Sequence, residues 1–276
     1  RRGAATDPYG VFWLELVEVL GRERLVVRNL PERGKRRIAK VPETMIEPDL
    51  VYPAVTGGDI ERWGATPSIY FLMTQNPETC APFPETEMKQ RWPRTYTYLT
   101  QFRDVLLSRG SKTVVQLAER TAFYAQFGIG PYTVAPYRVV WKRMASDVVA
   151  AVVSQHKTPF GFRPVIATDT TSLIAAASEE EAHYLCAVLN AKPVRDFIKS
   201  YSSAGRGFGA PAVMQHVGIP RFDESCKPHQ LLAGLSMKLH SFRSAGDVFA
   251  LKKGEADVDE AAAGLFGKRR GLEWRR

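Results

Sequence analysis

A predicted helix at residues 178–190 most constrains the fold of this chain, because the sequence specifies both its start and its buried face. Ser178 with Glu181 three residues later forms a capping-box pattern, in which each side chain satisfies a backbone donor at the helix start. Apolar side chains then recur at the spacing of one helix face, at Ala182, Leu185, Cys186 and Leu189. Asn190 and Pro193 end this helix and predict a second one that continues to Tyr201.

A glycine-rich segment of unusual composition follows the two helices. Between Tyr201 and Pro211 it contains three glycines, one arginine and one phenylalanine, with few side chains that would build a core. The apolar residues 219–222 then predict a closing strand. We therefore expect an exposed loop between a rigid helical support and a return to the core.

Strand patterns dominate the first part of the chain and helical patterns the last. Predicted strands lie at residues 11–16, 24–29, 38–41, 68–74, 132–136, 138–143, 148–153 and 164–169. Predicted helices lie at residues 95–107, 228–242 and 257–266, with a short helical turn from Asp59 to Trp63. This order predicts an α+β fold, with a twisted mixed β-sheet and a helical C-terminal section. We expect one domain over residues 1–245, followed by a C-terminal helix and basic tail over residues 246–276.

The formal net charge of +9 suggests an anionic partner such as nucleic acid. Arg1 and Arg2 carry +2 and residues 268–276 carry +4, which leaves only +3 for the rest of the chain. A slightly basic globule without a nucleic-acid partner would have a similar balance. Charge alone therefore does not decide between the two interpretations.

Composition also bears on the compartment. The three cysteines are odd in number and far apart, a pattern typical of reduced thiols in a cytoplasmic protein. No apolar run approaches the roughly 18 residues of a membrane span, so we expect no membrane partner. The sequence begins at Arg1 without a methionine, and we expect it to be part of a longer protein.

The common catalytic signatures are absent from the sequence. It contains no GxxxxGK[ST], HExxH, CxxC or GxSxG motif, and its five histidines show no metal-ligand spacing. The glycines at 205, 207 and 209 do not match a dinucleotide fingerprint, because they lead to Pro211 instead of opening a helix. We therefore expect no catalytic residues and no metal site in this chain, and a binding module is the favoured class.

The order of four local motifs resembles the specificity domain of N6-adenine DNA methyltransferases. These motifs are GAAT with GVFW (residues 3–13), EPDLVYP with GDIERW (47–63), SEEEAHYLCAVLN (178–190) and IPRF (219–222). The similarity extends over residues 3–242, and the nearest family is the TaqI-like C-terminal specificity, or target-recognition, domain. This family occurs in type IIG restriction–modification enzymes and in phage-defence methylases.

The resemblance implies that this chain positions duplex DNA for a catalytic domain that the sequence does not contain. The N-P-P-Y segment and the S-adenosylmethionine glycine motif of such methyltransferases are missing, and Asn76-Pro77 lacks the aromatic residue that would stack on a flipped adenine. Two smaller departures are Ala191, where the family has a small hydroxyl residue, and the pair Gly57-Gly58, which replaces a basic residue of the family and removes a possible phosphate contact. We expect the methyltransferase domain in cis or in trans, with S-adenosylmethionine as the cofactor of the parent enzyme and no cofactor in this chain.

A recognition domain needs two kinds of contact, one with phosphates and one with base edges. In the glycine-rich segment, Arg206 would pair with a guanine and Phe208 would stack or wedge. Basic residues elsewhere would bind phosphates. The predicted DNA-binding residues are Ser203, Arg206, Phe208, Asp59, Arg62, Trp63, Lys142, Arg143, Lys157, Arg163, Lys35 and Arg36.

Each of these assignments has a structural alternative. The glycine-rich segment is also typical of a mobile surface loop. Trp63 is more typical of a core residue than of a base contact, and Asp59 with Arg62 of a local capping pair. The lysines and arginines are compatible with a solvated basic edge. For the whole chain, the alternatives to DNA recognition are a stand-alone nuclease-like enzyme and a protein-interaction domain.

Overall fold

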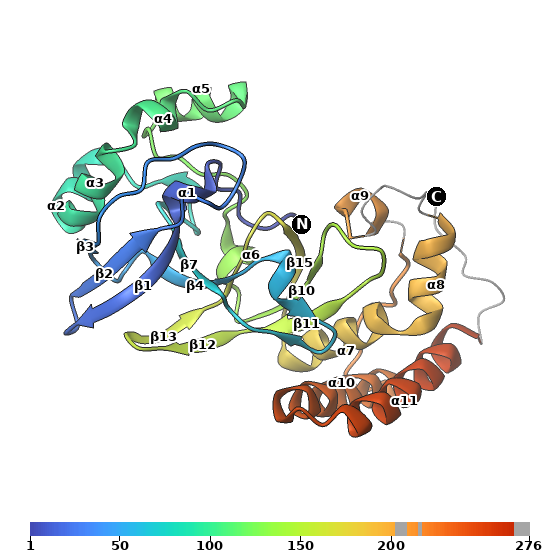
Figure 1. Cartoon of the computed structure of the whole chain (residues 1–276). Coiled ribbons are helices and arrows are strands. Elements are labelled where there is room, and N and C mark those ends of the chain that lie inside the picture. The colour runs from blue at the N-terminus through green and yellow to red at the C-terminus, as the bar shows by residue number, and fades with distance from the viewer. Residues whose placement is uncertain (202–208, 215–216, 268–276) are drawn as a thin grey trace.

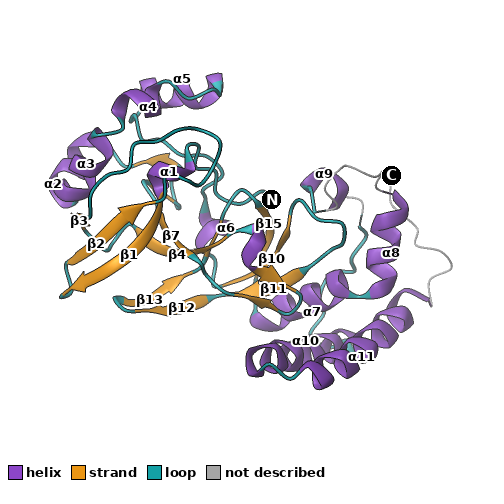
Figure 2. Ribbon diagram, viewed as in Figure 1, coloured by secondary structure: helices purple, strands orange, loops and turns teal. Residues whose placement is uncertain are grey.

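A computed structural model describes residues 1–201, 209–214 and 217–267 of the chain (Figure 1). A sheet-rich part contains the N-terminal half of the chain, and a helical part contains the residues that follow Ser178. Figure 2 shows the strands gathered in the first part and in the centre, with the C-terminal helices beside them. The predicted α+β class, with a mixed sheet and a helical C-terminal section, is confirmed.

The larger sheet has six strands, and all neighbouring pairs are antiparallel except β14 with β4, which is parallel. In spatial order the strands are β14 (Ile166–Ala167), β4 (Val51–Val55), β7 (Ile69–Leu72), β1 (Trp13–Leu20), β2 (Arg24–Asn29) and β3 (Thr44–Ile46). The register of β1 against β2 shifts between Leu16 and Glu18. Leu14, Leu25 and Phe71 are fully buried, in agreement with the apolar character of the predicted strands at residues 11–16, 24–29 and 68–74.

Short helices lie on this side of the molecule, of which the first four contribute to the core of the sheet and the fifth packs against the fourth. They are α1 (Tyr9–Phe12), α2 (Glu85–Arg91), α3 (Pro93–Thr100), α4 (Arg103–Leu107) and α5 (Lys112–Arg120). Pro93 begins α3, where a missing N–H costs nothing. The nearby Glu47 carboxylate accepts hydrogen bonds from the Thr95 N–H at 2.9 Å and the Thr95 hydroxyl at 2.7 Å. Glu47 thereby links the start of α3 to the residues that follow β3.

A smaller antiparallel sheet lies between the sheet-rich and helical parts. Its strands, in spatial order, are β11 (Ala150–Val153), β10 (Tyr137–Lys142) and β15 (Thr171–Ala176). Residues 2–5 run alongside it. Their backbone forms isolated β-bridges, Arg2 with Ser172 and Ala4 with Thr168. The first residues of the chain are therefore held between the two sheets.

The helical part is built on α7 (Glu179–Asn190), whose predicted cap is confirmed. The Ser178 hydroxyl accepts from the Glu181 N–H at 3.1 Å, and the Glu181 carboxylate accepts from the Ala177 N–H at 2.6 Å. Three acids in its first turn match the positive end of the helix dipole. The other helices are α8 (Lys192–Tyr201), α9 (Pro211–Met214), α10 (Lys227–Ala245) and α11 (Val248–Gly267).

Helices α10 and α11 form an antiparallel pair against α7 (Figure 1). Gly246, with φ of 72°, ends α10 in the left-handed conformation that favours glycine. Leu251, Val258 and Ala262 of α11 belong to the same buried cluster as the apolar face of α7. None of the described helices combines the length and the apolar composition that a membrane span requires.

Several predicted elements differ from the structure. Residues 38–41 and 219–222 form no strand, and residues 132–136 lie largely in a short helix, α6 (Pro131–Val134). Pro131 favours this helix because it follows Gly130 and fixes the first helical φ angle. Residues 219–222 have no regular secondary structure, and the Pro220 carbonyl accepts a hydrogen bond from the Tyr184 hydroxyl of α7 at 2.9 Å.

Element lengths also differ. The predicted helix 95–107 is broken after Thr100 into α3 and α4, and the last helix begins at Val248 instead of residue 257. Strand β15 and the hairpin of β12 (Gln155–Thr158) and β13 (Gly161–Pro164) were not predicted. The hairpin is mostly exposed, so it lacks the apolar alternation by which a half-buried strand is recognised.

Candidate nucleic-acid interface

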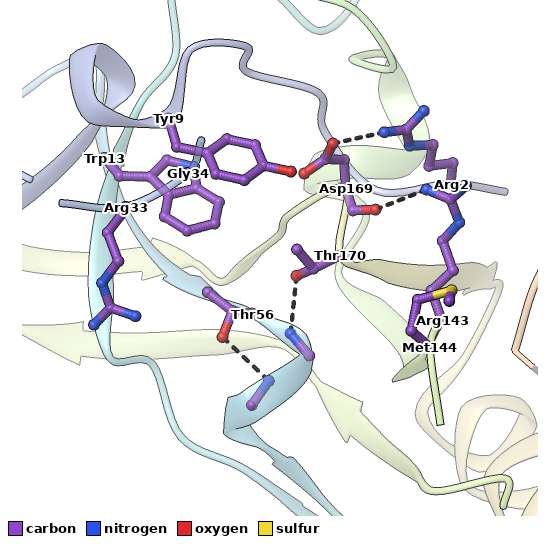
Figure 3. Close-up of a pocket in the computed structure, with 12 residues that line it drawn as sticks. Arg2, Tyr9, Trp13, Arg33, Gly34, Thr56, Arg143, Met144, Asp169 and Thr170 are labelled. Carbon is purple, nitrogen blue, oxygen red and sulfur yellow. Dashed lines mark hydrogen bonds and ion pairs between the residues drawn. The ribbon is translucent and has the colours of Figure 1, made fainter. Parts of the chain in front are cut away.

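A recess of about 560 Å³ lies where the first residues of the chain meet both sheets. Five separate segments line it: Arg2 with residues 9–13, the loop at 33–34, the turn at 56–58, the loop at 143–144 and the loop at 169–170. Figure 3 shows side chains from all five segments around one opening.

One wall of the recess is aromatic. The rings of Tyr9 and Trp13 stack with their centroids 4.2 Å apart and an interplanar angle of 4°. Gly34 lies against the Tyr9 ring, and its φ of 89° is left-handed, so both conformation and space favour glycine there. Burial and the charge of the nearby Asp169 raise the pKa of the Tyr9 hydroxyl well above its usual range, so Tyr9 remains neutral.

The opposite wall is positively charged. Arg2 donates through Nη2 to Asp169 Oδ2 at 2.6 Å, and Arg143 donates through Nη1 to the Asp169 backbone carbonyl at 3.2 Å. Arg33 is exposed on the aromatic side, with its Nε 4.0 Å from Glu32 Oε1. Three guanidinium groups therefore face a recess lined by one carboxylate, a balance that favours an anionic ligand.

The floor of the recess is a short 3₁₀ turn, η1 (Gly57–Asp59). Thr56 caps it by accepting from the Gly58 N–H at 3.2 Å, and the Gly57 N–H donates to the Thr170 hydroxyl at 2.9 Å. Asp59 Oδ2 accepts from the Thr56 N–H, the Thr56 hydroxyl and the Ser68 hydroxyl, at 2.6, 2.8 and 2.8 Å. The Asp59 carboxylate thus completes the capping box of the turn.

The predicted readers Ser203, Arg206 and Phe208 lie outside the described residues. The structure does describe Gly209, where the chain returns from this segment. The Gly209 carbonyl accepts from the Trp141 indole N–H at 2.9 Å and from the Ser172 hydroxyl at 2.8 Å. A side chain at position 209 would lie 1.9 Å from the Lys142 carbonyl oxygen. The segment therefore rejoins the fold beside Lys142, next to Arg143 at the recess.

Arg62 and Trp63 lie in a different environment. Trp63 is 1% exposed, and its indole N–H donates to Glu255 Oε1 of α11 at 2.8 Å. Arg62 reaches the same Glu255 oxygen at 3.3 Å and Asp147 at 3.6 Å. Both residues join the 3₁₀ turn to the helical part and are not brought into the recess.

Asp147 is the centre of an ionic cluster beside Arg62. Its Oδ2 lies 2.7 Å from Arg195 Nη1 and 3.3 Å from Lys199 Nζ, both on α8. Burial opposes ionisation of Asp147, but its hydrogen bonds with Arg195 and Lys199 prevail and lower its pKa below the usual range. The cluster fixes the loop that carries Arg143 against α8.

The remaining predicted residues fall into two groups. Lys35 and Arg36 line a neighbouring recess of about 540 Å³ that shares Tyr9, Arg33 and Gly34 with the first, and Arg36 donates to the Ser108 hydroxyl at 2.8 Å. Lys157 and Arg163 lie on the hairpin of β12 and β13, which projects to the lower left in Figure 1, away from the N-terminus and α9. The structure thus brings Lys35, Arg36 and Arg143 to two adjoining recesses, whereas Lys142 lines neither of them and Lys157 and Arg163 lie apart on the hairpin.

Arg2, Tyr9 and Asp169 were missed by the sequence reasoning. Arg2 was counted only as terminal charge, because its partner lies 167 residues away and no local pattern connects the two. The run Thr168-Asp169-Thr170-Thr171 was a usable signal, since closely spaced hydroxyl and carboxylate side chains after a strand are typical of a polar turn.

No group of three or more His, Cys, Asp or Glu side chains within the described ranges is arranged to hold a metal ion. Comparison with known protein families finds no match for the chain, and no curated protein matches its sequence. The resemblance drawn from the four sequence motifs therefore remains a prediction.

Proposed function

We propose that this chain binds double-stranded DNA and recognises its sequence, as the specificity part of an adenine-N6 methyltransferase or a restriction–modification enzyme. The single observation that carries the proposal is a recess lined by three arginines, Arg2, Arg33 and Arg143, and by one carboxylate, that of Asp169. Guanidinium groups suit phosphates and guanine edges, because their N–H donors form a planar fork.

Two further features support this location. Lys35 and Arg36 extend the positive charge into the neighbouring recess. Gly209, the first described residue after the glycine-rich segment, is held beside Trp141 and Lys142, next in the chain to Arg143. A surface of this size with separated cations suits a polyanion better than a small anion.

In this proposal, methyl transfer belongs to a catalytic domain in cis or in trans that binds S-adenosylmethionine. The chain holds the duplex so that the target adenine can leave the stack and enter that domain. Incubation of the chain alone with DNA, S-adenosylmethionine and Mg²⁺ should give neither methylation nor cleavage, whereas a stand-alone nuclease would cut the DNA.

A salt titration tests DNA binding directly. We expect anisotropy of a labelled mixed-sequence duplex to report binding that weakens steeply with salt, with a slope of about −0.9 for each phosphate contact. Arg33→Ala should make that slope shallower by about one. Arg22→Ala is the matched control, because it removes an exposed arginine at the turn between β1 and β2, outside the recess. Binding without salt dependence, or no binding at low salt, would refute the proposal.

A further inference from the structure

Arg2 is the most firmly positioned of the three arginines at the recess. Its backbone bridges Ser172 of β15, and the Gly3 N–H donates to the Thr171 carbonyl at 3.1 Å. A side chain at position 3 would lie 2.1 Å from the Thr168 carbonyl oxygen, so the chain passes here as closely as two backbones can. The backbone from which the Arg2 side chain extends is therefore fixed relative to the recess.

The Arg2 side chain is held as well. Its Nη2 donates to Asp169 Oδ2 at 2.6 Å, and the Asp169 side chain is only 8% exposed while that of Arg2 is 50% exposed. The Tyr9 hydroxyl points toward the same carboxylate (Figure 3). A nearly buried acid thus fixes one edge of the Arg2 guanidinium group, while half of the Arg2 side chain remains exposed at the recess.

The carboxylate determines which ligand this arginine suits. Because Asp169 offsets the charge of Arg2, the pair attracts a phosphate less than Arg33 or Arg143 does. The geometry of the remaining donors is unaffected, since a guanidinium has five N–H groups and Asp169 takes one of them. Because Asp169 already restricts the Arg2 side chain, Arg2 also loses less conformational freedom on binding. These properties favour a directional contact with a neutral acceptor pair, which on DNA is the O6 and N7 edge of guanine.

We propose that Arg2 reads a guanine in the recognised DNA sequence and that Asp169 is its positioning residue. This inference rests on the proposed DNA binding and adds to it the base that is read and the residue that reads it. Arg33 and Arg143, which no carboxylate side chain holds at hydrogen-bond distance among the described residues, bind phosphates.

The test is selection of bound duplexes from a random pool, followed by sequencing, with the full 276-residue chain. The wild type should enrich a site that contains guanine. Arg2→Ala should lower the preference for guanine at one base pair on the order of 10–100-fold and leave the other positions unchanged. Asp169→Asn should lower the preference at the same position, without the change in salt slope that follows the loss of a phosphate contact.

Arg33→Ala serves as the comparison, because the loss of a phosphate contact should weaken all sequences equally. If Arg2→Ala weakens all sequences equally and makes the salt slope shallower by about one, while the charge-conserving Arg2→Lys keeps the slope and the selected site, Arg2 binds a phosphate and the inference is wrong. It is also wrong if both variants select the wild-type site unchanged. In either case the wild type still binds DNA, so the proposed function stands. Thermal melting of each variant checks folding, and the two Arg2 variants decide the question if Asp169→Asn does not fold.

Discussion

The indole N–H of Trp63 donates to the carboxylate of Glu255 at 2.8 Å, although the two residues are 192 positions apart. Trp63 has a φ of 68°, a left-handed conformation that bulky residues rarely adopt. Its backbone N–H donates to the Ala150 carbonyl at 3.1 Å. One strained residue thus connects the 3₁₀ turn, the smaller sheet and the last helix.

Glu255→Ala should destabilise the protein by about 1–3 kcal/mol, because it leaves a buried indole N–H without its acceptor. Urea unfolding followed by tryptophan fluorescence measures this change. Glu260→Ala is the matched control, since Glu260 is an exposed acid on the same helix. Equal stability of the two variants would show that the Trp63–Glu255 hydrogen bond contributes little.

Stability should fall in mild acid because of two buried histidines. His240 Nε2 accepts from the Val152 N–H at 2.9 Å, so its proton is on Nδ1, which faces the Ser236 carbonyl at 2.8 Å. The His183 ring lies edge-on to His240 with centroids 4.8 Å apart. Burial, and then the charge of His240, lower the pKa of His183 to about 3, and burial lowers the pKa of His240.

Both histidines have folded-state pKa values below 6.5, so the unfolded chain binds more protons as the pH falls through that value. The free energy of unfolding is therefore retained above pH 6.5 and decreases below it. For His183 the loss should reach about 2 kcal/mol at pH 5, since each unit of pH corresponds to about 1.4 kcal/mol.

Urea unfolding between pH 5 and 8 measures this loss. His183→Gln should make the pH dependence shallower by up to one proton, whereas His156→Gln, at an exposed site in β12, should not change it. An unchanged pH profile in His183→Gln would mean that another group causes the acid sensitivity.

Gly209→Ala should destabilise the protein by about 1–3 kcal/mol, because the added methyl group meets the Lys142 carbonyl at 1.9 Å and the Trp141 ring at 2.8 Å. Thermal unfolding should show a lowered midpoint. Gly218→Ala provides the comparison, since a methyl group there has no neighbour within 4 Å among the described atoms. If Gly209→Ala and Gly218→Ala have the same unfolding midpoint, the backbone at Gly209 is not tightly packed.

Sequence patterns predicted correctly those elements whose contacts join residues close together in the chain. The cap of α7 and the strand at residues 24–29 depend on residues close in the chain, and both were predicted. Residues 219–222 were wrongly predicted as a strand, because an apolar run does not reveal whether a neighbouring strand is available. There the Pro220 carbonyl pairs with the Tyr184 side chain instead.

The candidate site was predictable only in part, for the same reason. Lys142 and Arg143 lie at the end of a predicted apolar strand, and their charge there led to their prediction as phosphate contacts. Arg2 and Asp169 meet across 167 residues, and that contact exists only after both sheets have formed. Burial of an acid next to an exposed arginine is a property of the folded molecule, which no spacing rule describes.

The parallel pairing of β14 with β4 has a consequence for the kinetics of folding. Ile166 pairs with Ala54 and Arg2 with Ser172, so the recess closes only after segments more than 100 residues apart have met. Such long-range closures are slow steps, because loop entropy is lost before the contacts form. During synthesis Arg2 therefore cannot take its place at the recess until the chain has been made beyond residue 172. Any fragment that ends before β15 should fold its first hairpin yet lack a competent anion site.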